Sequence, residues 1–150
     1  MRINRKVEYA LIALKHMNQK RPGELTSVKE IAELYGCPGD VLAKVLQTLS
    51  RKQILKSEQG TFGGYHIQKD LSKVSLHDLF STVLGPQTLV KCLQVKNHDC
   101  EIKETCNILG PIANLNARME EFYRGLTIQE ILQGKKAKAN RVSMLEEHSL

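Results

Sequence analysis

Three of the four cysteines in this 150-residue chain lie within one short stretch, CLQVKNHDCEIKETC, which runs from Cys92 to Cys106. Thiolates bind zinc and iron–sulfur clusters, and thiols also form disulfides. If two of the three thiols form a disulfide, one thiol stays free. As metal ligands, the three supply one fewer than a tetrahedral site needs. The stretch therefore predicts a metal centre that needs a further donor, or a redox-sensitive group of thiols.

The spacing of these cysteines favours an iron–sulfur cluster over structural zinc. Seven residues separate Cys92 from Cys100, and five separate Cys100 from Cys106. Structural zinc sites usually contain cysteine pairs two residues apart, because each pair must converge on one ion. Wider gaps let a loop surround a larger object, and a 4Fe–4S cube held by three thiolates leaves one iron without a ligand. Donors available in the sequence for that iron are His98, Asp99, Glu101, Glu104 and Cys37.

The composition is that of an ordinary soluble globular protein, with 41% hydrophobic and 25% charged residues. The length suits one domain, or a compact domain with an appendage. No apolar run approaches the roughly 18 residues of a membrane helix, and Glu8, Tyr9 and Lys15 interrupt the N-terminal apolar stretch, unlike in a signal peptide. We therefore expect a cytoplasmic protein without a membrane segment. The net charge of +6 favours an acidic partner, most commonly nucleic acid.

Two predicted helices joined by a tight turn indicate a helix-turn-helix motif. Apolar residues at spacings of three and four first predict an N-terminal helix over residues 3–18. Ser27 and Glu30 then match a capping box at the start of the next helix. The turn CPGD follows, and a further helix carries apolar residues over 41–49. Cys37 lies in the turn, where we expect a small buried side chain more than a ligand.

A predicted hairpin after these helices completes the pattern. Residues 54–57 and 65–67 are expected to form strands on either side of the glycine-rich turn EQGTFGG. Three helices followed by a hairpin give the order of a winged helix-turn-helix, which is mainly α with a small β-hairpin. In that arrangement the second helix of the motif enters the major groove, and the hairpin lies along the backbone or in the minor groove. We therefore predict a domain over residues 1–84 that binds a double-stranded DNA operator.

Candidate DNA contacts follow from this arrangement. At the start of the recognition helix, Lys44 suits guanine and Asp40 can accept a hydrogen bond from cytosine. The predicted base-contacting residues are Gly39, Asp40, Ala43 and Lys44. The predicted phosphate-contacting residues are Arg2, Lys29, Arg51 and Lys52. The candidates on the wing are Gln59 and Thr61.

A heptad-like apolar stripe follows the last cysteine and predicts one long helix. Its members are Ile108, Ile112, Leu115, Met119, Phe122 and Leu126. We expect so long a helix in so small a chain to pack on a partner copy, with packing on its own domain as the alternative. Residues 85–107 are then a cysteine-rich cluster-binding loop, and 108–133 are a dimerisation helix with a short docking helix. The basic residues 134–150 are expected to form a disordered tail.

Together these features resemble the winged-helix transcription regulators that include the iron–sulfur regulator IscR and the nitric-oxide sensor NsrR. The resemblance covers nearly the whole chain. It rests on MRINRKVEYAL, IAELYGCPGDVLAKVLQTL, GTFGGY, the three-cysteine loop and the closing FYRGLTIQEIL. It implies a homodimer that swaps long C-terminal helices. It also implies a repressor whose operator binding is controlled by a cluster that senses nitric oxide, redox state or iron supply.

Within that group the cluster region is most similar to NsrR. IscR-like members carry a histidine shortly after the third cysteine, whereas this chain has CNILG. NsrR-like members use a carboxylate from the first helix of the other subunit, in the motif DYAL, and this chain has EYAL with Glu8 there. The resemblance thus implies a cluster, 4Fe–4S in preference to 2Fe–2S, held by Cys92, Cys100, Cys106 and Glu8 of the partner subunit. Many members have arginine where this chain has Gln59, so we expect weaker contact between the wing and a narrow minor groove.

Two other interpretations of the cysteines are open. Cys92, Cys100 and Cys106 could form a disulfide on oxidation and bind no cluster, which would make the chain a thiol-switch regulator. Alternatively, zinc could stabilise a dimeric adaptor that binds protein. An enzyme is not expected, because the sequence shows no convincing nucleophile–base pair, phosphate-binding loop or paired-carboxylate site.

Overall fold

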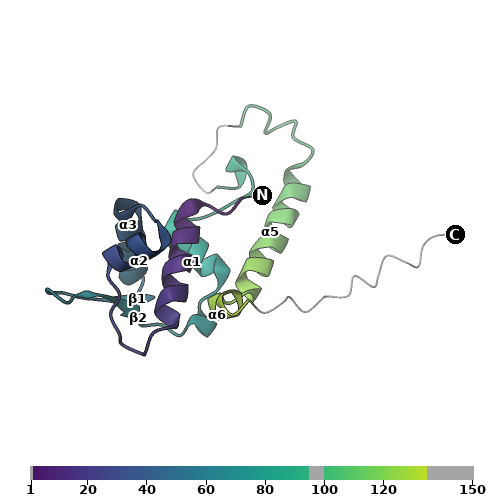
Figure 1. Ribbon diagram of the computed structural model, residues 1–150. Helices are drawn as coiled ribbons and strands as arrows, with labels where there is room; N and C mark the ends of the chain where they lie inside the picture. The colour runs from purple at the N-terminus through teal and green to yellow at the C-terminus, as the bar shows by residue number, and fades with distance from the viewer. Residues whose placement is uncertain (1, 95–99, 135–150) are drawn as a thin grey trace.

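The fold is mainly helical, with one antiparallel hairpin between the third and fourth helices (Figure 1). The computed structural model describes residues 2–94 and 100–134. Its elements are α1 (Arg5–Asn18), α2 (Val28–Tyr35), α3 (Gly39–Arg51), β1 (Leu55–Glu58), β2 (Gly64–Ile67), η1 (Leu71–Lys73), α4 (Leu76–Leu84), η2 (Lys91–Leu93), α5 (Leu109–Gly125) and α6 (Ile128–Leu132). No helix within these residues is both long enough and apolar enough to cross a membrane.

The helices α1 to α4 surround one apolar core. Apolar residues three and four positions apart lie on one face of a helix, and that face is buried in both α1 and α3. In α1 the buried residues are Val7, Ala10, Ala13, Leu14 and Met17. In α3 they are Leu42, Val45, Leu46 and Leu49. Asn4 begins α1 by accepting a hydrogen bond from the amide of Lys6 at 2.9 Å. Helices α2 and α3 follow each other across a short turn, so the helix-turn-helix predicted from the sequence is confirmed.

The hairpin is anchored to the segment that precedes α2. Strands β1 and β2 pair from Leu55 opposite Ile67 to Glu58 opposite Gly64. Thr26 adds a further rung, because its amide donates to the carbonyl of Tyr65 at 2.9 Å and the Tyr65 amide donates back at 2.8 Å. This rung ties the wing to the segment that begins the helix-turn-helix.

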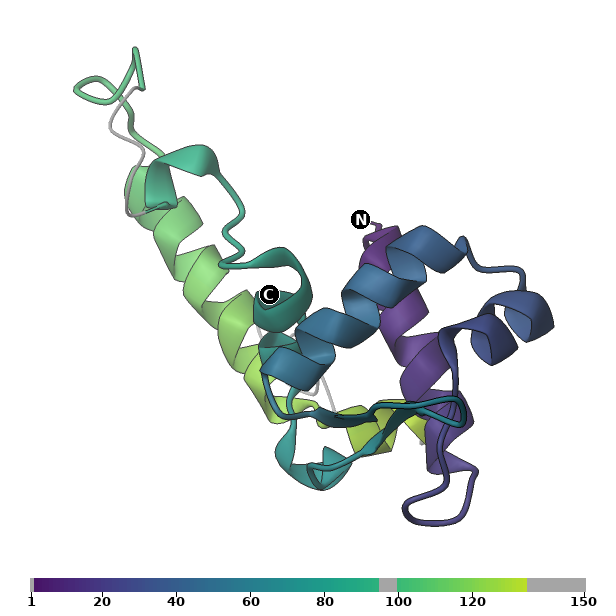
Figure 2. The same ribbon diagram turned by 90° about the vertical axis from the view of Figure 1, so that its left-hand side faces the viewer.

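The C-terminal elements return to the same core. Helix α5 lies along α4, where the rings of Tyr123 and Phe80 meet edge to face at 5.2 Å. Ile128 at the start of α6 is fully buried, and its amide donates to the carbonyl of Val74 at 2.8 Å. The end of α5 is thus held on the winged helix, whereas its start and the cysteine loop project away from it (Figure 2).

Packing within the chain covers only part of the apolar stripe on α5. Ile112 and Met119 are half-buried. Ile108, Leu115 and Phe122 are spaced seven residues apart, and their exposed fractions are 55%, 48% and 62%. Packing among the described residues therefore leaves this row uncovered.

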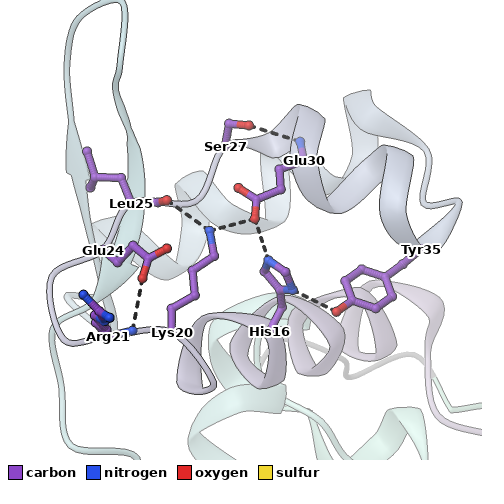
Figure 3. A network of polar contacts seen from close by, with 8 residues as sticks. All are labelled: His16, Lys20, Arg21, Glu24, Leu25, Ser27, Glu30 and Tyr35. Atoms are coloured by element: carbon purple, nitrogen blue, oxygen red, sulfur yellow. Dashed lines mark hydrogen bonds and ion pairs between the residues drawn. The ribbon is translucent and has the colours of Figure 1, made fainter.

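A polar network between α1 and α2 corrects one detail of the predicted cap. Ser27 accepts a hydrogen bond from the amide of Glu30 at 3.1 Å, as predicted. The Glu30 carboxylate, however, lies 2.8 Å from Nε2 of His16 and 2.7 Å from Nζ of Lys20 (Figure 3). The hydroxyl of Tyr35 lies 2.8 Å from Nδ1 of the same histidine. A nitrogen of His16 on α1 and the ammonium of Lys20, just after the helix, thus hold the carboxylate, and the network ties α2 to the end of α1.

This network makes stability depend on pH through Glu30. Partial burial opposes ionisation of Glu30, but hydrogen bonds from Lys20 and His16 outweigh it and lower its pKa. Because the lowered pKa belongs to the folded state, the network stabilises the fold above the ordinary glutamate value of about 4. That stability is lost as the pH falls through the lowered value.

We expect Glu30→Gln to lower the free energy of unfolding at pH 7 by about 1 kcal/mol, since the site is partly exposed. Urea unfolding at pH 7 and near pH 3 measures the effect, and the difference from wild type should shrink at the lower pH. Glu33→Gln on the same helix is the control, because its ion pair with Lys29 is exposed and 3.9 Å long. Equal stability of Glu30→Gln and wild type at pH 7 would contradict the role of the network.

Candidate functional site

The start of α3 is an open, exposed surface. Because α3 buries one face, the opposite face carries Asp40, Lys44 and Gln47, four and three residues apart, and all three are exposed. No side chain caps the helix start at Pro38, and a Cβ added to Gly39 would meet nothing within 4 Å. The structure therefore brings Gly39, Asp40 and Lys44 together on this surface. Half-buried Ala43 lies beside them.

The predicted phosphate contacts fall in three places. Lys29 extends from α2, with 82% of its side chain exposed. Arg51 and Lys52 are exposed at the opposite end of α3. Arg2 lines a cleft of about 350 Å³ together with residues of α4 and α5, including Phe80 and Asn116. The first three cations thus lie on α2 and at the end of α3, whereas Arg2 precedes α1 and faces α4 and α5.

The wing lies on the same side of the molecule as α2 and α3 (Figure 1). Gln59 and Thr61 are exposed at its tip, as the sequence predicts. Sequence reasoning passed over Phe62, whose side chain is 91% exposed at the same tip. The available signal was an aromatic residue in the middle of a glycine-rich turn, a position that polar residues usually occupy.

The cysteine loop carries three accessible thiols. Cys92 is exposed in η2, and Cys100 and Cys106 are half-buried further along the loop. All four cysteines of the chain are free thiols, and His98 and Asp99 lie outside the described residues. The thiol chemistry of the loop therefore fits an iron–sulfur cluster, which binds to thiolates.

Cys37 packs in the apolar core, where its side chain is only 7% exposed. Burial raises the pKa of the Cys37 thiol, which disfavours the thiolate form that a metal binds. The small buried side chain that the sequence predicts in this turn is therefore confirmed.

Glu8 lies apart from the cysteines within one chain. It is half-exposed on α1, where Nη1 of Arg5 lies 2.7 Å from its carboxylate. Among the described residues, no three His, Cys, Asp or Glu side chains are close enough together to hold a metal ion. The cysteine loop lies at the start of α5, well away from α1 in Figure 2. A single chain therefore holds these donors on separate elements.

Comparisons with known proteins place this geometry in context. The model of the Rrf2 family, described as iron-dependent transcriptional regulators, matches residues 3–134. An HTH-type transcriptional regulator of Aquifex aeolicus is 28% identical over 127 residues, which cover 84% of this chain and 88% of that protein. The regulator NsrR of Oceanobacillus iheyensis is 25% identical over 138 residues, which cover 90% and 92% of the two proteins. The solved structure of CymR, the global cysteine regulator of Bacillus subtilis, matches with a TM-score of 0.67 at 20% identity, over 91% of this chain and 99% of CymR.

Proposed function

Since this chain belongs to the Rrf2 family of iron-dependent transcriptional regulators, we propose that it is a repressor that binds a double-stranded DNA operator as a homodimer. An iron–sulfur cluster that responds to nitric oxide, redox state or iron supply controls the binding. The observation that carries the proposal is the open, exposed start of α3 beside the wing. The same chain carries Cys92, Cys100 and Cys106 on one accessible loop. The family is described as transcriptional regulators, which is consistent with the expectation that the protein is not an enzyme.

The DNA contacts follow from the exposed surface of α3. Lys44 and Asp40 contact base edges in the major groove, and Gly39 and Ala43 allow the helix to approach closely. Lys29, Arg51 and Lys52 contact phosphates on either side of the helix, with Arg2 as a further cation from the N-terminal segment. Gln59 and Thr61 contact the DNA from the wing.

The exposed row on α5 supports the homodimer. Ile108, Leu115 and Phe122 would pack against the same row of a second copy, because apolar surface in such a seam gains free energy when it leaves water. Residues 1–84 then form the DNA-binding domain, 85–107 the cluster-binding loop and 108–133 the dimerisation and docking helices. A dimer of this kind presents two α3 helices to half-sites about one helical turn apart.

The ligand set combines both chains. Cys92, Cys100 and Cys106 of one protomer supply three thiolates, and Glu8 of the partner subunit supplies a carboxylate. Four donors suit a 4Fe–4S cluster, with one for each iron, and a 2Fe–2S cluster, with two for each iron. We prefer 4Fe–4S because the wide gaps between the cysteines suit the larger cluster. Bound there, the cluster supplies iron with which nitric oxide or oxygen can react.

Glu8 couples this site to the DNA-binding surface. It lies in the first turn of α1, which packs on α3, and both helices contribute buried residues to one apolar core. While Glu8 is bound to the cluster, α1 is fixed in place. When the cluster releases Glu8, α1 and the neighbouring α3 can shift. A shift of a few ångströms changes the spacing of the two recognition helices. Moving occupancy of the operator from nearly full to nearly empty requires a difference of about 5.5 kcal/mol between the two states.

The test uses full-length protein prepared without oxygen. We expect bound iron and sulfide in the protein, and operator binding that changes when nitric oxide is added. Protein that holds neither after reconstitution would contradict the cluster. A metal-free protein whose electrophoretic mobility changes on oxidation would instead support the thiol switch, which the accessible thiols also fit. Zinc-containing protein that binds no DNA would support the adaptor.

Glu8→Gln tests the carboxylate ligand. Partners that only orient a metal ligand typically contribute 10- to 100-fold to affinity, so we expect loss of a direct ligand to speed cluster decay by about tenfold or more. Decay of the visible absorption in air measures this rate. The fold should be unaffected, because Glu8 makes one exposed ion pair with Arg5. Glu33→Gln serves as the control, and decay at the wild-type rate in Glu8→Gln would remove Glu8 from the site.

A further inference from the structure

The side chain of Phe62 is exposed without a structural reason. Its exposed fraction of 91% is the highest among the large exposed hydrophobic side chains of the described residues. An aromatic ring in that position contributes almost no burial to the fold. A small polar residue would serve the turn equally well, so the exposed ring calls for a role outside the chain.

The backbone holds Phe62 in a tight, closed turn. The amide of Gly63 donates to the carbonyl of Gly60 at 3.0 Å, which places Thr61 and Phe62 at the tip. A Cβ at Gly63 would lie 2.4 Å from the carbonyl oxygen of Glu58, so only glycine lets the chain close this way. The ring is therefore presented from a well-defined position at the end of the paired strands.

The tip has no positive charge with which to bind phosphate. Residues 58–64, EQGTFGG, contain neither lysine nor arginine. The carboxylate of Glu58 lies 3.7 Å from Nζ of Lys56 and 3.7 Å from Nε2 of His66, so the nearest cation is already paired. Any contact made by the tip must therefore be mainly uncharged, with the ring as its largest element.

The minor groove of DNA can accept an apolar side chain such as that of phenylalanine. Proteins that bind there insert apolar side chains, including phenylalanine, between base pairs and thereby kink the duplex. Flexible pyrimidine–purine steps accept this distortion most readily. The wing lies on the same side as α3 (Figure 1), so DNA bound along α3 would pass within reach of it.

We propose that Phe62 wedges between two base pairs in the minor groove, next to the major-groove segment that α3 contacts. The wing then selects the operator by how easily one base-pair step of the DNA deforms, and not through a cation that binds the minor groove. This inference rests on the proposed DNA-binding function, and it adds to it a specificity-determining residue and the DNA property that this residue senses.

The test compares variants of the full-length protein on one duplex, recovered from a random library by selection on wild type. We expect Phe62→Ala to weaken binding by about 5- to 150-fold, the range that corresponds to losing an aromatic side chain that stacks on a base. Phe62→Leu should retain much of the affinity. Ser57→Ala, an exposed position on β1 that makes none of the proposed DNA contacts, is the control and should bind nearly as wild type does. The salt dependence of binding should be unchanged in Phe62→Ala, because no cation is removed.

A second measurement locates the wedge. 2-Aminopurine at a flexible step beside the α3 contact should become brighter when wild type binds, and not when Phe62→Ala binds. Three results for Phe62→Ala would overturn the proposal: DNA affinity equal to wild type, a reduced salt dependence of binding, or loss of the dimer in sedimentation. Loss of the dimer would show that the ring packs on a second copy. In each of these cases wild type still binds DNA. Failure of wild type to select any duplex would instead remove the proposed function and this inference with it.

Discussion

Cys106→Ala is expected to abolish iron binding and leave the stability of the winged helix unchanged, whereas Cys37→Ala is expected to keep iron binding and make the fold less stable. The two variants make the same chemical change at a thiol. Cys106 is half-buried just before α5, outside the apolar core. Cys37 is 7% exposed within that core. The pair therefore separates a ligand role from a packing role.

The expected sizes follow from these surroundings. Loss of one of three thiolates should reduce iron and sulfide from about one cluster per site to nearly none, because an iron without its ligand is readily lost. Removing the buried sulfur of Cys37 leaves a small cavity, which should lower the free energy of unfolding by about 1 kcal/mol. Iron and sulfide analysis, together with urea unfolding of the metal-free proteins, measures both effects.

Two results would contradict the proposed ligand set. Full iron content in Cys106→Ala would show that Cys106 is not a ligand. Loss of iron in Cys37→Ala without any loss of stability would place Cys37 at the cluster, against its burial in the core. If wild type itself binds no iron, Cys106→Ala should still be tested for the oxidation-dependent mobility change that a thiol switch requires.

Gly64→Ala is expected to have the largest effect on stability among these variants, about 2–3 kcal/mol. A Cβ at Gly64 would lie 2.7 Å from the carbonyl oxygen of Thr26 and 2.9 Å from its carbonyl carbon. Both are backbone atoms of a fully buried residue, so they cannot move aside as a flexible side chain can. To relieve the contact, the rung between Thr26 and Tyr65 must open, which detaches the wing from the segment before α2.

Gly39→Ala is the matched control for this change. A Cβ at Gly39 meets nothing within 4 Å, and the residue begins α3. Alanine favours a helix over glycine, so stability should stay the same or rise slightly. Thermal unfolding of both variants measures the difference, and equal midpoints for Gly64→Ala and wild type would show that the close approach at Thr26 is unimportant.

Much of the local structure could be predicted from the sequence alone. Apolar residues three and four positions apart predict α1 and α3, and a glycine-rich turn between two short runs predicts β1 and β2. The helix predictions succeed because a period of 3.6 decides which side chains share a face, and that face is buried. The turn chemistry of the glycines marks the hairpin.

Contacts between distant segments needed the tertiary structure. The motif around Ser27 predicts that Glu30 turns back to cap its own helix, but packing places His16 of α1 and Lys20, just after it, beside the carboxylate. Two charged or polar side-chain donors are stronger partners than one backbone amide. Spacing along the chain carries no information about which helix will lie opposite.

The same limit applies to the surfaces that carry the proposals. The stripe on α5 is visible in the sequence, but only packing shows that Ile108, Leu115 and Phe122 stay exposed and that Ile112 and Met119 do not. Only the folded turn shows Phe62 held outward at the wing tip. Local periodicity thus determines the elements and their apolar faces, whereas exposure depends on which other elements cover a face, a matter decided by the packing of the whole chain.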